Sequence, residues 1–167
     1  MSSPPSFNSA TLRALLNRLI PPDDFPGALE SGVESYLLAQ WRNNDASEAA
    51  GLARGLAQLD LEAAARYSGL LFSHLTSQQQ DSLLSDLEAG RITTQWPAEI
   101  SAKIFTDRII NLAHEGFYAD PGNGGNREAV SWKMVGYDPR TPGRPVDGLP
   151  FTPAPRIEKP ENHAPRG

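Results

Sequence analysis

Apolar residues recur at helical spacing near the start of the chain. Five of them lie at offsets of 0, 3, 4, 7 and 8, which places them on one face of a helix: Leu12, Leu15, Leu16, Leu19 and Ile20. Asn8 or Ser9 can cap this helix. The Pro21-Pro22 pair ends it, because proline lacks the amide N–H that a continuing helix needs.

Two further helical stretches follow a turn over residues 23–27. The first breaks near residues 43–45 and has an apolar face formed by Val33, Tyr36, Leu37 and Trp41. The second covers residues 46–67 and favours a helix because it is rich in alanine. Gly69 interrupts it, and Leu71-Phe72 is expected to enter the core, together with Trp41 and Trp96.

Two more helices are predicted between residues 76 and 116. Thr76 with Gln79, or Ser77 with Gln80, has the spacing of a capping box, and this helix ends at Gly90. The last long helix is expected to begin at Trp96-Pro97 and to end at Gly116. Its predicted buried face consists of Ile100, Ile104, Phe105, Ile109, Leu112 and Ala113. The pattern therefore predicts an all-α fold, a small bundle of about five helices.

The sequence changes character after residue 116. Residues 120–127 form an irregular loop of glycine and asparagine, and residues 130–137 are ambiguous between a strand and a helical turn. From residue 138 onward, eight of 30 residues are proline. Such a segment buries too little apolar surface to become ordered alone. We therefore predict a helical domain over residues 1–137 and an extended Pro-rich tail over residues 138–167 that wraps a partner.

The composition argues against several classes of function. The 167 residues contain no cysteine, which removes disulfides, thiolate metal sites and thiol catalysis. A net charge of −5 argues against nucleic-acid binding. No apolar run approaches the roughly 20 residues that span a bilayer, so we expect no direct membrane insertion. Because the N-terminus shows no signal peptide or twin-arginine motif, we expect a cytoplasmic location.

The glycine loop and its flanks are the candidate region for chemistry. The loop follows a helix and lacks both the lysine of a phosphate-binding loop and the third glycine of the dinucleotide fingerprint. We therefore predict no cofactor in this chain. His114, Glu115 and Asp120 allow an alternative, a stand-alone helical hydrolase or metal-dependent enzyme. Adjacent helical residues point about 100° apart, however, which favours a capping role for His114. A free-standing adaptor is a further alternative.

Two motifs closely resemble the signature of the gluconate 2-dehydrogenase subunit 3 family. They are Glu115-Gly-Phe-Tyr-Ala-Asp-Pro-Gly-Asn-Gly-Gly-Asn-Arg and Ser131-Trp-Lys-Met-Val-Gly-Tyr. Residues 19–24 and 26–28 are similar to the N-terminal pattern of that family. The positions that the resemblance marks as partner-binding are Glu115, Gly116, Phe117, Tyr118, Asp120, Pro121, Gly124, Gly125, Asn126, Trp132, Lys133, Gly136 and Tyr137.

The resemblance implies a function within a complex. Family members are small, or gamma, subunits of FAD-dependent sugar and sugar-acid dehydrogenases, and similar subunits accompany glucoside 3-dehydrogenases. The flavin and the catalytic base belong to a large subunit of the glucose-methanol-choline (GMC) oxidoreductase type. The chain is thus expected to be non-catalytic and chaperone-like: it binds and stabilises that FAD-containing subunit. An electron-accepting cytochrome is a further expected partner.

The resemblance also gives the loop an expected role in docking. Phe117, Tyr118, Trp132 and Tyr137 are large, stiff side chains of the kind that interface hot spots favour. The alternative is that these aromatic residues close the core of their own domain. We expect Gly124 and Gly125 to adopt backbone angles that a Cβ would resist. We expect Asn126 either to bond to nearby main chain or to reach the partner.

Overall fold

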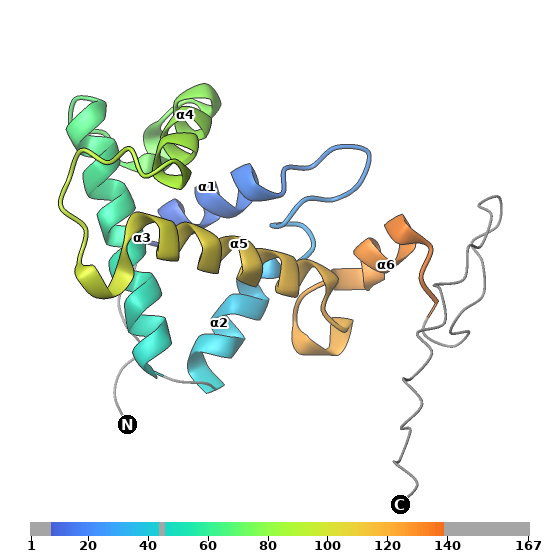
Figure 1. The fold of residues 1–167 in the computed structure, drawn as a ribbon. Coiled ribbons are helices and arrows are strands. Elements are labelled where there is room, and N and C mark those ends of the chain that lie inside the picture. Colours follow the sequence, from blue (N-terminus) through green and yellow to red (C-terminus); the bar gives the residue numbers. More distant parts are fainter. Residues whose placement is uncertain (1–7, 44–45, 139–167) are drawn as a thin grey trace, which may run out of the picture.

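The described structure is an all-α fold (Figure 1). The computed structural model describes residues 8–43 and 46–138. Within them lie six α-helices and no strand: α1 (Ser9–Leu19), α2 (Val33–Asn43), α3 (Ala46–Arg66), α4 (Ser77–Glu88), α5 (Ala102–Tyr118) and α6 (Val130–Val135). The predicted fold class is confirmed, and the ambiguous stretch after the glycine loop is helical. Residues 139–167 lie outside the described residues, so the boundary at 137 and the wrapping tail stay predictions.

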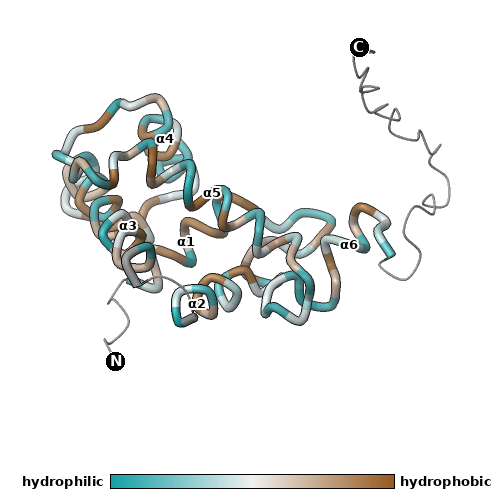
Figure 2. Tube along the Cα trace, turned by 60° about the horizontal axis from the view of Figure 1, so that its bottom comes forward, coloured by the Kyte–Doolittle hydropathy of each residue, from teal (hydrophilic) through white to brown (hydrophobic). Residues whose placement is uncertain are grey.

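Helix α5 is the centre of the bundle and packs against each of the other five helices. Figure 1 shows it crossing the molecule, with α3 and α4 near one end and α6 beyond the other. Its core residues Phe105 and Ile109 are 1% exposed. Leu12, Leu15 and Leu16 of α1 are fully buried, as the first apolar stripe predicts. Figure 2 shows these apolar segments of α1 and α5 inside a more hydrophilic outline.

Side-chain caps mark the start of three of the described helices, α1, α4 and α5. The Asn8 side chain accepts from the amides of Ala10 and Thr11. Of the two predicted capping boxes, the structure forms the one between Thr76 and Gln79. Phe72 is fully buried and Trp96 is 8% exposed, in agreement with the expected core, whereas Trp41 is only partly buried against it.

The predicted bounds of the last long helix are wrong at both ends. Pro97 precedes a short 3-10 turn, and extended backbone at Ser101 separates that turn from α5, which Ser101 caps. Helix α5 starts at Ala102. Ile104 lies about 100° around this helix from the buried Phe105, on the side away from Ile109, and is 53% exposed. At the other end α5 continues to Tyr118, because Gly116 is used for close packing, where a Cβ would lie 2.8 Å from the Tyr36 ring.

A buried carboxylate ties the connection between α4 and α5 to α3. Glu62 is 0% exposed and accepts hydrogen bonds from the Thr93 amide, the Thr94 amide (2.9 Å) and the Thr94 hydroxyl. It also pairs with Arg66 at 2.7 Å. Burial by itself raises the pKa of Glu62, but the bonds from Thr94, Thr93 and Arg66 together outweigh it and lower that pKa to about 2.

Candidate interaction site

The glycine loop closes around one buried amide side chain. Asn126 is 0% exposed, its Nδ2 donates to the Ala119 carbonyl at 2.9 Å, and its Oδ1 accepts from the Ser131 amide at 2.9 Å. Its backbone N–H donates to the Gly116 carbonyl at 3.1 Å. Of the two roles expected for Asn126, the structure shows bonding to main chain, which joins the end of α5 to the start of α6.

Two adjacent glycines of the loop are needed for different reasons. Gly124 has φ of +92°, the left-handed region that the sequence led us to expect. Gly125 does not share that conformation. A Cβ on Gly125 would instead lie 2.1 Å from the Gly116 carbonyl oxygen, so only glycine lets the loop approach α5 this closely. The expectation of unusual backbone angles is therefore confirmed for Gly124 and wrong for Gly125.

The segment after these glycines holds three non-glycine residues with left-handed backbone. The φ angles of Asn126, Glu128 and Ala129 are 44°, 58° and 54°. Each such residue costs roughly 1–2 kcal/mol relative to the right-handed form. Hydrogen bonds hold the segment in this shape: the Arg127 amide donates to the Ser31 carbonyl and the Ala129 amide to the Asn126 carbonyl, both at 2.8 Å.

The four aromatic residues of the motifs divide between core and surface. Phe117 is 4% exposed and closes the core of its own domain, which is the alternative to docking that the sequence left open for these side chains. Tyr118 and Tyr137 are 48% and 50% exposed. Trp132 is half-buried, donates from Nε1 to the Tyr118 carbonyl at 3.3 Å, and meets the Tyr137 ring edge-on at 5.2 Å. The outer surface of this region is therefore aromatic and held by its own contacts.

The other predicted positions support this arrangement or lie at its rim. Asp120 accepts from the Gly122 amide at 2.8 Å and caps a short turn that begins with the half-buried Pro121. Gly136 ends α6 with φ of 67°. Lys133 is exposed in the last turn of α6, and Glu115 is exposed near the end of α5. The partner-binding role of these residues stays a prediction.

The three residues of the enzyme alternative do not form a site. His114 lines a hollow beside Phe117, whereas Glu115 lines another beside Arg108. Asp120 is engaged with the loop backbone. Within residues 8–43 and 46–138, no three or more histidine or acidic side chains are grouped so that they could hold a metal ion.

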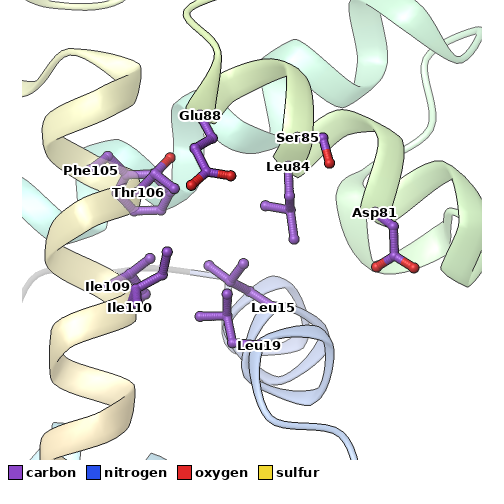
Figure 3. Close-up of a pocket in the computed structure, with 10 residues that line it drawn as sticks. All are labelled: Leu15, Leu19, Asp81, Leu84, Ser85, Glu88, Phe105, Thr106, Ile109 and Ile110. Atoms are coloured by element: carbon purple, nitrogen blue, oxygen red, sulfur yellow. The ribbon is translucent and has the colours of Figure 1, made fainter.

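Two apolar hollows follow the seam between α1 and α5, and the sequence analysis did not predict them. The first, of about 280 Å³, lies between α1, α4 and α5 (Figure 3). The second, of about 270 Å³, shares Leu19 with the first and reaches Phe25, Tyr118 and Met134. The stripe containing Leu19 indicated an apolar face, but only the packing of the helices shows which part of it stays uncovered.

None of the described helices is long and apolar enough to cross a membrane. No match was found among curated proteins or among solved structures. The family model for gluconate 2-dehydrogenase subunit 3 matches residues 8–139, which include all six helices and the closed loop. The chain therefore belongs to the gluconate 2-dehydrogenase subunit 3 family.

Proposed function

We propose that this chain is the non-catalytic small subunit of a flavin-dependent dehydrogenase complex, in which it binds and stabilises a GMC-type large subunit. Membership of a family described as a dehydrogenase subunit supports assembly into a hetero-oligomer. The substrate class that fits this assignment is a sugar, a sugar acid or a glucoside. The chain then acts on its partner, and the chemistry takes place in that partner.

One observation carries the proposal: the motif region presents aromatic surface while its interior is closed. Asn126 satisfies main-chain groups from both sides of the loop. Tyr118 and Tyr137 remain about half exposed, and Tyr118 lines the apolar hollow that Phe25 borders. Rigid aromatic side chains next to an uncovered apolar surface are the composition that protein interfaces favour. The geometry therefore suits a docking element better than a catalytic centre.

The proposal also assigns the cofactor and the further partners. The large subunit holds FAD and supplies the base that takes the substrate proton, and this chain holds no cofactor of its own. The complex is cytoplasmic, and an electron-accepting cytochrome can reoxidise the flavin. The isolated chain, incubated with FAD and then desalted, should show no flavin absorbance. Stoichiometric retention of flavin by the isolated chain would contradict this assignment.

Co-expression with the neighbouring reading frame tests the proposed function directly. We expect a yellow complex that elutes as one species and contains both chains. The large subunit expressed alone should be less soluble, less active, or both. Sugar oxidation or hydrolysis by the small chain alone would reject the proposal, as would a large subunit that is equally stable and active without it.

A further inference from the structure

The seam between α1 and α5 forms an uncovered apolar groove beside the motif region. In the first hollow, side chains from three helices point toward one another, among them Leu19 of α1, Leu84 of α4 and Ile110 of α5 (Figure 3). All three are half-buried, whereas Leu15 and Ile109 at the floor are closed off almost completely. The core below is therefore complete, and the half-buried rim is the part that another chain could cover.

The groove continues to the exposed aromatic residues. Leu19 lines both hollows, and on α5 the lining passes from Ile110 in the first to His114, one turn later, in the second. Phe25, which is 41% exposed, and Tyr118 stand at the far end. The groove thus extends the proposed docking surface along the helices toward α4.

The groove carries acidic residues at both ends. Glu88 projects from α4 into the first hollow and has no hydrogen bond or ion pair within the described part of the chain (Figure 3). Asp81 is already neutralised, because Arg18 binds it through two hydrogen bonds of 2.8 Å. At the second hollow Asp23 lies exposed, next to Asp24. An apolar floor between acidic ends is complementary to apolar anchors flanked by lysine or arginine.

We infer that this groove receives an amphipathic helix of the large subunit, with apolar anchors on one face and a basic residue opposite Glu88. The inference rests on the proposed function, and it names the element of the partner and the place where it docks. A groove between packed helices is filled well by anchors at helical spacing.

Two other occupants fit the groove less well. A second copy of this acidic chain would bring more negative charge to Glu88, Asp23 and Asp24. Residues 139–167 of the chain itself carry basic residues, but no two successive prolines among the eight there are separated by more than four residues. That spacing leaves no stretch with apolar anchors at helical period. The large subunit is therefore the occupant that the charge and the shape of the groove favour.

Site-specific cross-linking in the purified co-expressed complex identifies the occupant. A photoreactive phenylalanine analogue replaces Leu84 in the groove and, as the control, Leu61 on α3, which is 57% exposed and lines neither hollow. We expect the probe at position 84 to label a large-subunit peptide with apolar residues at helical spacing and at least one lysine or arginine, and the probe at position 61 to label none. Labelling of residues 139–167, of a second copy, or of nothing in an intact complex would overturn the inference.

Charge reversal at the groove provides a test that does not disturb the core. Glu88 is exposed, so Glu88→Lys should leave the helix content and Tm unchanged while weakening the complex about tenfold. Leu84→Lys should weaken it further, and Leu61→Lys should have no effect. If the wild-type chain forms no complex, the proposed function fails. If it does and both groove variants bind within about twofold of it, the inference fails while the proposed function stands.

Discussion

The two irregular connections at the ends of α5 are fixed by buried side chains of different character. Before the helix, residues 89–101 are tied down by Glu62, which reaches them from α3 across 31 residues of sequence. After the helix, residues 119–129 are closed by Asn126, which lies within the loop itself. Both side chains are 0% exposed. Glu62 accepts from two backbone amides and also from the Thr94 hydroxyl and the Arg66 guanidinium, whereas the Asn126 side chain bonds to backbone groups alone. One tie is charged and distant in sequence, and the other is neutral and local.

The charged tie makes the stability of the domain depend on pH, whereas the neutral tie holds the shape of its loop at any pH. A buried carboxylate that is fully bonded contributes strongly as long as it stays charged, and it becomes a liability once a partner is lost or a proton binds. A buried amide has no such dependence on pH. The connection before α5 therefore contributes to the acid stability of the domain, whereas the connection after α5, beside the exposed aromatic residues, keeps its shape across the pH range.

Removal of the charged tie should have the largest effect. Glu62→Ala deletes a fully buried acceptor and leaves the Thr93 and Thr94 amides and part of the Arg66 guanidinium without it. Loss of one member of a buried pair costs on the order of 4 kcal/mol. Urea unfolding followed by circular dichroism should show this loss in the isolated domain. A change below about 1 kcal/mol would mean that water replaces the carboxylate.

Acid should weaken the same tie in a defined pH range. Because the folded state lowers the pKa of Glu62 from 4.5 to about 2, its contribution is fully present above about pH 5 and is lost as pH falls toward 2. The shift corresponds to about 3 kcal/mol. The pKa of Asp86 is also lowered, chiefly by its hydrogen bond from Arg91, so wild-type data combine both carboxylates. Subtracting the profile of Glu62→Gln, which keeps Asp86, isolates Glu62, and a difference that does not vary with pH would contradict the assignment.

Removal of the neutral tie should cost less and should act locally. Asn126→Ala leaves the Ala119 carbonyl and the Ser131 amide without their partner and places alanine at a φ of 44°. We expect a loss of about 2 kcal/mol that does not depend on pH between 3 and 7. Hydrogen exchange should increase at residues 119–131, while the amides of α3 stay protected. A uniform increase in hydrogen exchange over the whole domain would show that the loop opens only when the whole domain unfolds, which would contradict a local effect.

The comparison also explains what the sequence could predict. The helices, the Thr76 capping box and the left-handed Gly124 depend on neighbours within a few residues, and so does the closure by Asn126. The tie from Glu62 could not be predicted, because glutamate within an alanine-rich helix indicates a solvated face, and only the fold brings residues 93 and 94 to it.

The same limit applies to the candidate site. The motifs indicated which segment is unusual, but they did not separate the buried Phe117 from the exposed Tyr118 beside it. The groove could not be predicted from the sequence for a related reason. Leu84 and Ile110 belong to apolar stripes like many core residues, and their exposure depends on how far α4 stands from α1 and α5. Local patterns predict elements, whereas long-range packing decides which faces stay open.

The smallest effect concerns backbone strain, which also differs between the two connections. The loop after α5 holds three non-glycine residues with left-handed backbone, Asn126, Glu128 and Ala129. In the connection before α5, the one residue with left-handed backbone is a glycine, Gly90. Ala129→Gly should raise stability by about 0.5–1 kcal/mol, because the relieved strain exceeds the entropy that glycine adds to the unfolded chain. The matched control, Ala57→Gly on the exposed face of α3, should lower stability by about 1 kcal/mol. If urea unfolding shows that Ala129→Gly raises the free energy of unfolding while Ala57→Gly lowers it, the loop is strained at position 129. If both substitutions lower the free energy of unfolding, the left-handed backbone at Ala129 is not strained.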